Sequence, residues 1–169
     1  MDAERFDLIV KFEEEETQQD YFEKIVIEHV EDSLKKSNSS YFIKETEYFN
    51  IFMVEFNENN IQTAVKIANS TQPRKLEAVP IESVVVTRPD KIQDKIIDMS
   101  KKRIKTGEKF AIDCNIRGRY IKTKEEFIQT LTRELIKLKG QPDESNPDWV
   151  IHIEVLGEST GISVLKKHL

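Results

Sequence analysis

The chain has 169 residues, of which 38% are apolar and 34% are charged, and its formal net charge is −5. This length suffices for one good-sized hydrophobic core or two small ones. The single cysteine, Cys114, excludes an internal disulfide and a thiolate metal cluster. No apolar run approaches the roughly 20 residues of a membrane helix, and the N-terminal residues lack the features of a signal peptide. We therefore expect a soluble, cytoplasmic protein with no membrane partner.

The net charge conceals a difference between the two halves of the chain. Residues 1–87 hold 9 basic and 18 acidic residues, whereas residues 88–169 hold 17 basic and 13 acidic residues. An acidic protein is a poor candidate for binding nucleic acid, but a basic second half restores that possibility. Chance drift between the halves is the alternative explanation.

The first half predicts the order strand, helix, strand, strand, helix, strand. Irregular structure is expected between Pro73 and Pro80, because the two prolines bracket that stretch. The order is that of the split βαβ, ferredoxin-like pattern, so we expect an α+β protein whose first domain covers residues 1–87. The strands are predicted at residues 6–12, 41–45, 48–56 and 81–87, and the helices at residues 21–36 and 61–68.

The second half begins at Arg88-Pro89-Asp90, which we take as the domain boundary, and extends to residue 169. Thr123 and Glu126 have the spacing of a capping box at the start of a helix. The predicted elements are a helix from residue 92 to a glycine stop at 107, an alternating strand at 110–117, a helix at 124–138, a loop at 140–147, and strands at 149–155 and 162–165.

No pattern for catalysis or cofactor binding stands out in the sequence. The three histidines, His29, His152 and His168, do not lie in a glycine-rich or elbow-like context. With five glycines in all, the chain has no loop that would cradle a nucleotide, and Cys114 lies on the apolar face of its strand. We expect no cofactor, no metal site and no catalysis by the chain itself.

Basic residues cluster at two element ends of the second half, and a helix end that meets a strand end would form one concave patch. Several Lys and Arg side chains would bind phosphate groups together and release counterions. Tyr120 could stack on a base or serve as a partly buried strut. A solvated surface is the other interpretation of the charges. The candidate RNA-binding residues are Lys101, Lys102, Arg103, Lys105, Arg117, Arg119, Tyr120, Lys122 and Lys124.

Three segments in order resemble the THUMP domain of RNA-modifying proteins. They are FAIDCNIRGR at Phe110 to Arg119, SNPDWVIHIEV at Ser145 to Val155, and GESTGISVLK at Gly157 to Lys166. The last is similar to the closing hairpin of proteins of the Tan1 type. The resemblance covers roughly the second half of the chain, and it implies a THUMP-like α/β domain at residues 88–169 behind a ferredoxin-like domain.

The resemblance also implies a function. Proteins of the Tan1 type assist an RNA cytidine acetyltransferase in making N4-acetylcytidine in tRNA, and they lack a catalytic domain. By resemblance, this chain would be an adaptor that binds tRNA, at its acceptor end, and no DNA. Two alternatives stay open. One is a specificity subunit of another tRNA-modifying enzyme, for methylation or thiolation, and the other is a protein-interaction module that uses the acidic first half.

Overall fold

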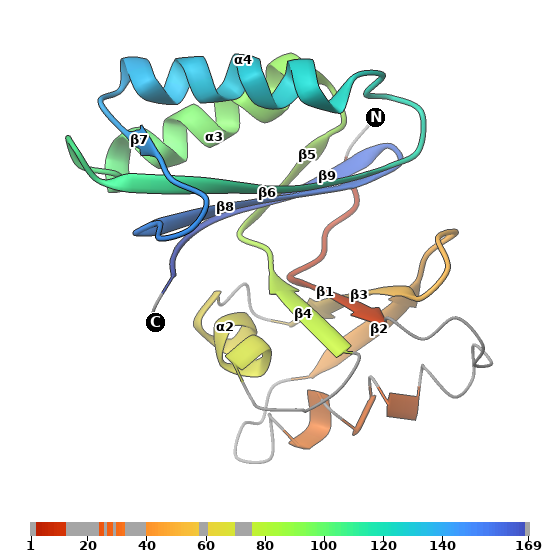
Figure 1. Cartoon of the computed structure of the whole chain (residues 1–169). Coiled ribbons are helices and arrows are strands. Elements are labelled where there is room, and N and C mark those ends of the chain that lie inside the picture. Colours follow the sequence, from red (N-terminus) through yellow and green to blue (C-terminus); the bar gives the residue numbers. More distant parts are fainter. Residues whose placement is uncertain are drawn as a thin grey trace. The chain divides into compact units, whose positions relative to one another are not determined.

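The computed structural model describes residues 3–12, 24–25, 27–28, 30–32, 40–57, 61–69 and 76–167. It confirms the expected α+β class, with two sheets and packed helices (Figure 1). The chain divides into two compact units. We call Arg5–Ile81 the N-terminal unit, and Met1–Glu4 together with Glu82–Leu169 the C-terminal unit. Among the described residues, no helix has the length and apolarity to cross a membrane.

The N-terminal unit is built on a four-stranded antiparallel sheet in the order β2-β3-β1-β4, an arrangement compatible with the ferredoxin-like pattern. Alternate residues of the strands, such as Leu8 and Phe52, pack with Ala64 and Ile67 of the helix into one core. The elements are β1 (Leu8–Phe12), β2 (Tyr41–Glu45), β3 (Ile51–Phe56), α2 (Ile61–Asn69) and β4 (Leu76–Pro80).

The last strand of this unit differs from the predicted one. β4 (Leu76–Pro80) lies in the stretch expected to be irregular, where it forms an edge strand beside β1. An edge position tolerates Pro80 at the strand end, since a proline has no N–H for a further ladder bond. The strand expected at residues 81–87 forms as β5 (Ser83–Val86) but pairs with β9 of the other sheet. The two units therefore meet in sequence after Ile81, not at Arg88.

The bounds of two other predicted elements, a helix and a strand, differ from those in the structure. Within residues 21–36 the described positions 24–25, 27–28 and 30–32 are helical, and the rest lie outside the described residues, as do Glu13 to Glu16. β3 begins at Ile51 instead of residue 48, because the Thr46 hydroxyl accepts a hydrogen bond from the Tyr48 N–H at 3.1 Å and fixes a turn. That turn ends at Asn50, whose φ of 64° is left-handed.

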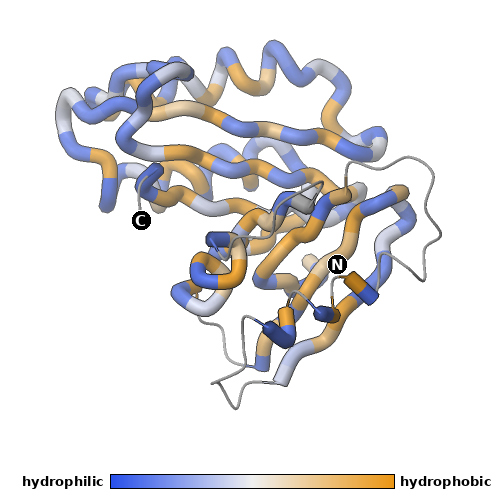
Figure 2. The backbone as a smooth tube through the Cα atoms, turned by 60° about the horizontal axis from the view of Figure 1, so that its bottom comes forward, coloured by the Kyte–Doolittle hydropathy of each residue, from blue (hydrophilic) through white to orange (hydrophobic). Residues whose placement is uncertain are grey.

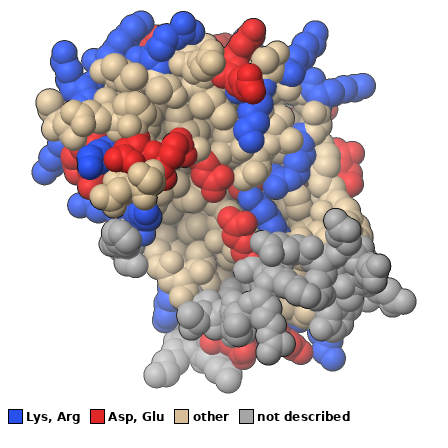
Figure 3. Space-filling model, in the orientation of Figure 1, with Lys and Arg blue, Asp and Glu red and all other residues tan. Residues whose placement is uncertain are grey.

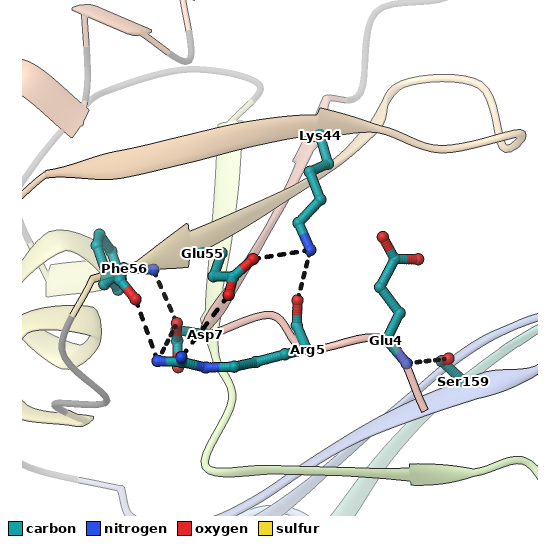
Figure 4. A network of polar contacts seen from close by, with 7 residues as sticks. All are labelled: Glu4, Arg5, Asp7, Lys44, Glu55, Phe56 and Ser159. Atoms are coloured by element: carbon teal, nitrogen blue, oxygen red, sulfur yellow. Dashed lines mark hydrogen bonds and ion pairs between the residues drawn. The ribbon is translucent and has the colours of Figure 1, made fainter. Parts of the chain in front are cut away.

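A polar network fixes the start of the N-terminal unit around the buried Asp7 (Figure 4). Its carboxylate accepts a hydrogen bond from the Phe56 N–H at 2.8 Å and lies 3.6 Å from the Arg5 guanidinium. Glu55 extends the network, since it pairs with Arg5 at 3.7 Å and with Lys44 at 3.1 Å. Burial raises the pKa of Asp7, against the lowering effect of the Phe56 hydrogen bond.

This environment predicts different outcomes for two substitutions of Asp7. Asp7→Ala leaves the buried Phe56 N–H without an acceptor and should cost about 1–3 kcal/mol of unfolding free energy. Asp7→Asn keeps an oxygen acceptor and removes a buried charge, so it should stay within about 1 kcal/mol of the parent. Urea denaturation at pH 7 measures both. Equal destabilisation by the two variants would show that the charge of Asp7, rather than the acceptor, stabilises the unit.

The C-terminal unit is a five-stranded mixed sheet in the order β5-β9-β8-β6-β7. β6 is parallel to both β7 and β8, whereas β9 is antiparallel to β8 and β5. Both helices lie over one face of this sheet (Figure 1). The further elements are α3 (Pro89–Arg103), β6 (Lys109–Arg117), α4 (Lys124–Lys137), β7 (Gln141–Pro142), β8 (Trp149–Leu156) and β9 (Ser159–Lys166).

The core of this unit follows from alternation along the strands, and Figure 2 shows apolar residues concentrated in them. Phe110 and Cys114 of β6 point toward the helices and are 1% and 5% exposed. The predicted burial of Cys114 is therefore confirmed, and Trp149 at the start of β8 is buried as well. Asp148 orients the start of β8, because its carboxylate accepts a hydrogen bond from the Lys109 N–H at 2.8 Å. The Asn-Pro-Asp turn therefore has a structural role, since its last residue joins the starts of β6 and β8.

Candidate nucleic-acid interface

The two predicted basic clusters lie at opposite ends of the C-terminal unit. The helix α3 leads directly into β6, so Lys101, Lys102, Arg103 and Lys105 lie at the end where β6 begins. The second cluster begins with Arg117, the last residue of β6, and continues through Arg119, Lys122 and Lys124. A strand of nine residues spans about 26 Å between its first and last Cα atoms. The helix end and the strand end do not meet, and the single patch that we expected is not formed.

In the cluster at the end of α3, the first two lysines are solvated. Lys101 and Lys102 pair with Asp98 along the helix at 3.6 and 3.4 Å, and their side chains are 55% and 67% exposed. A hydrogen bond from Lys102 lowers the pKa of Asp98. Their placement also complements the negative end of the helix dipole, which is a structural reason for lysines in this turn. Lys105 is exposed just beyond them.

Arg103 has a structural role within the C-terminal unit. Its guanidinium donates to Glu82 at 2.6 Å and to the Val164 carbonyl at 2.8 Å. Glu82 in turn accepts the Val164 N–H at 2.8 Å. This triangle ties α3 to β9 and to the residue before β5. These Arg103 N–H groups are therefore used within the protein and are not available to a phosphate.

Arg117 is engaged in the same way at the other end. Its guanidinium lies 2.8 Å from Glu154, whose side chain is completely buried, while that of Arg117 is 19% exposed. Asn115 donates a second hydrogen bond to the Glu154 carboxylate at 3.1 Å. Glu154 lies on the central strand β8 and requires a positive partner there. The main role of Arg117 in this structure is therefore to neutralise the buried Glu154 carboxylate within the sheet.

The residues after Arg117 form the exposed part of the second cluster. Gly118 has a φ of 103°, a conformation that a side chain disfavours, and it turns the chain away from the sheet. Arg119, Lys122 and Lys124 follow and are exposed to solvent. In the described part of the chain, Lys122 and Lys124 take part in no ion pair. This set is available to an anionic partner, and we call Arg119, Lys122 and Lys124 the basic loop.

Tyr120 lies within the basic loop, and its hydroxyl group is fixed by a hydrogen bond. Its hydroxyl donates to Glu158 at 3.0 Å, and 43% of the residue is exposed. The hydrogen bond to Glu158 raises the pKa of Tyr120, whereas the nearby Arg119 lowers it. The ring is therefore fixed in orientation and still reachable from solvent. Of the two alternatives for Tyr120, a partly buried strut does not fit a residue with this exposure, and stacking on a base stays a prediction.

An open hollow of about 460 Å³ lies beside the basic loop. The first turns of α3 and α4 border it, since it is lined by Pro89 and Gln93 of α3 and by Thr123, Glu126 and Phe127 around the start of α4. The hollow also has Tyr120, Ile121, Lys122 and Thr130 in its lining. The part of α3 in this site was not predicted, although Pro89 at the first helical position marks where that helix begins.

Neither helix start is capped by a side chain. The N-cap residues Arg88 and Thr123 make no side-chain hydrogen bond to their helices. The predicted Thr123–Glu126 capping box is therefore wrong, although α4 begins where it was expected. The first N–H groups of two helices point out of the same end of the unit, where the helix dipoles favour an anion. Asp90, Glu125 and Glu126 in the first turns offset part of this field.

Figure 3 shows Lys and Arg side chains distributed over the helical side of the C-terminal unit, with Asp and Glu among them. The basic loop is distinguished from this background by its position at the two helix starts, not by the density of charge.

The described residues contain no cluster of metal-binding side chains. His152 and Asp113 approach to 3.5 Å, and in the described segments they belong to no group of three metal-binding side chains. Burial raises the pKa of the Cys114 thiol to about 11, so Cys114 is almost entirely a thiol at neutral pH. The basic loop and the exposed ring of Tyr120 are suited to contacts with anions and with aromatic rings.

Comparison with known proteins identifies the domain. Residues 86–165 match the family model of the THUMP domain, so the chain contains a THUMP domain over this range. No curated protein matches the chain.

Solved structures share the fold at low sequence identity. PH1313 from Pyrococcus horikoshii Ot3 is 19% identical, with a TM-score of 0.69 over 96% of this chain and 54% of its own. A 4-thiouridine synthetase, solved as an RNA complex with bound ATP, is 15% identical, with a TM-score of 0.60 over 95% and 41%. TrmN from Thermus thermophilus is 9% identical, with a TM-score of 0.52 over 93% and 45%. The chain thus spans about half the length of these proteins.

Proposed function

Because residues 86–165 form a THUMP domain, we propose that this protein binds tRNA through its C-terminal unit and acts in tRNA modification. The observation that carries the proposal is the basic loop at the uncapped starts of α3 and α4. Phosphate groups accept hydrogen bonds from helix N-termini and from Lys and Arg together. Three exposed cations in one loop can contact successive phosphates of one strand, and each contact releases counterions.

The fixed ring of Tyr120 supports a single-stranded part of the tRNA as the ligand. Unstacked bases bind to exposed aromatic rings, whereas bases inside a duplex do not reach them. The hollow beside the ring offers room for a base, and we expect the neighbouring basic loop to contact the phosphates of the same strand. The acceptor end of tRNA, whose terminus is single-stranded, fits this combination.

The role that we assign to the chain is that of an adaptor in the cytoplasm, without catalysis of its own. It would hold the tRNA and present it to an RNA cytidine acetyltransferase for formation of N4-acetylcytidine, as proteins of the Tan1 type do. Its contribution to the rate would be orientation of the substrate. The test is reconstitution with a purified acetyltransferase and tRNA, with N4-acetylcytidine measured by mass spectrometry in the presence and absence of the chain.

A second candidate role is that of a specificity subunit for another modification, thiolation or methylation. One observation favours thiolation, since the fold is shared with a 4-thiouridine synthetase solved in complex with RNA. Both roles need the same hold on tRNA. If the chain stimulates a thiolation enzyme and has no effect on acetylation, then its partner is the thiolation enzyme and not the acetyltransferase.

Binding to tRNA is tested by fluorescence anisotropy over a range of salt concentrations. We expect the logarithm of the association constant to fall linearly with the logarithm of salt, with a slope of about −2 to −3 for three phosphate contacts. A tRNA that lacks its single-stranded 3′ terminus should bind at least about fivefold more weakly, since the loss of base stacking costs about 1–3 kcal/mol per base. No binding of tRNA at low salt would favour the protein-interaction module instead.

A further inference from the structure

The edge of the C-terminal sheet at β6 is only partly covered. β7 pairs with Lys109 and Phe110, and beyond that point the chain turns away through Asp143, whose carboxylate accepts the Ser145 and Asn146 N–H groups. The Asp143 N–H donates to the Phe110 carbonyl at 2.9 Å, so the Phe110 backbone faces the β7 side. Alternate residues of a strand direct their backbone groups to the same side. Ile112, Cys114 and Ile116 therefore face outward as well.

Within the described residues, no strand lies beside these three on the side away from β8. In the part of the chain that the structure describes, no backbone group pairs with the outward N–H and C=O groups of Ile112, Cys114 and Ile116. The open stretch is bounded at one end by β7 and at the other by Gly118, where the chain leaves the sheet. It holds none of the prolines, lysines or bulges that protect exposed edges from pairing with another strand.

The sequence of the open stretch is close to a palindrome. It reads Ile112-Asp113-Cys114-Asn115-Ile116, so an antiparallel copy centred on Cys114 places Ile opposite Ile and Asp opposite Asn. The pairing is also correct for the backbone, because each outward residue then lies opposite an outward residue and exchanges two hydrogen bonds with it. Like charges do not meet, and the apolar pairs lie on the face that packs against the helices.

We propose that two copies of this chain associate through their β6 edges, antiparallel and centred on Cys114. Ile112 of one copy lies opposite Ile116 of the partner, and Gly118 turns each chain away before it would collide with the partner's β7. The interface is isologous, as in most symmetric dimers. The antiparallel pairing directs the two basic loops to opposite ends of the paired strands.

The extent of the open edge sets the strength of the association. Five paired residues on each side bury less than the roughly 1,200 Å² of a standard interface, so the dimer is weak. Sedimentation velocity on the full chain without RNA should show the weight-average mass rising from the 19.8 kDa of the monomer toward twice that value as the protein concentration approaches about 100 μM. A constant monomer mass over this range overturns the proposal.

A matched pair of double variants tests the edge itself. Ile112→Glu/Ile116→Glu places like charges opposite each other and should abolish the rise in mass. Ile112→Lys/Ile116→Glu is equally polar at the same two positions but places opposite charges together, and should associate at least tenfold more tightly than the first variant. Equal association of the two variants rejects pairing through β6. The circular dichroism spectrum of each variant verifies that it is folded.

The register is tested with single cysteines in the background of Cys114→Ser. A mixture of the Ile112→Cys and Ile116→Cys proteins should form a disulfide-linked heterodimer under copper-phenanthroline oxidation, because paired Cα atoms lie about 5.5 Å apart. Neither protein alone should do so, since equivalent positions lie about 14 Å apart in this register. Equal cross-linking of each protein alone would indicate random collision and overturn the register.

Discussion

Replacing Arg119, Lys122 and Lys124 together by Gln should lower the affinity for tRNA about 100-fold at near-physiological salt. Each of three phosphate contacts contributes about 1 kcal/mol, and a loss of about 3 kcal/mol is two powers of ten in the association constant. The slope of log affinity against log salt should also shrink, by about 0.7–0.9 for each phosphate that no longer has a cationic partner. Fluorescence anisotropy with labelled tRNA at several salt concentrations measures both effects.

The other end of the same unit provides the matched control. Lys101, Lys102 and Lys105 are also exposed, and their replacement by Gln removes the same net charge. If the basic loop is the site, this variant should lose less than about threefold in affinity and keep its salt slope, since only the long-range field has changed. Equal losses in the two variants would mean that overall charge, and not a site, attracts the RNA. A larger loss of affinity in the control variant would indicate that the RNA binds at the end of α3 instead.

The sequence predicted features that depend on neighbouring residues better than features that depend on pairing between distant segments. The strand β6 was predicted closely, because alternation between Phe110 and Arg117 reports one buried and one polar face within the strand itself. The assignment of residues 81–87 to the first domain failed for the opposite reason. Val84 and Val85 mark a strand, but which sheet a strand joins depends on pairing with β9, more than 70 residues away. Periodicity carries no information about that partner.

The site was predicted in part, for a related reason. Basic residues can be counted in the sequence, but whether each one is available depends on its partners. Arg103 and Arg117 are engaged by Glu82 and Glu154, which are 21 and 37 residues away in sequence and come beside them only in the folded chain. The prediction that the two clusters meet was wrong because it ignored the direction of α3 relative to β6. A helix that leads into a strand ends where that strand begins. RNA contact by the exposed residues stays a prediction.

Arg117→Ala should destabilise the protein by about 3–5 kcal/mol, as measured by urea denaturation. From the sequence alone Arg117 is a surface residue, for which a change of under about 0.5 kcal/mol would be expected. The structure alters that expectation, because Glu154 has no exposed surface and its carboxylate lies 2.8 Å from the Arg117 guanidinium. Removing one partner leaves a buried carboxylate without its countercharge, which is far more costly than losing an exposed pair.

Two further variants separate the buried charge from the loss of side-chain packing. Arg119→Ala, two residues on and exposed, should change the free energy of unfolding by no more than about 0.5 kcal/mol. Arg117→Met/Glu154→Leu removes both charges and keeps the apolar volume, so it should recover most of the stability lost in Arg117→Ala. If the double variant is as unstable as Arg117→Ala, the loss comes from packing around the strand end. If Arg117→Ala itself is as stable as the parent, Glu154 finds another countercharge, and Arg117 becomes available to the RNA after all.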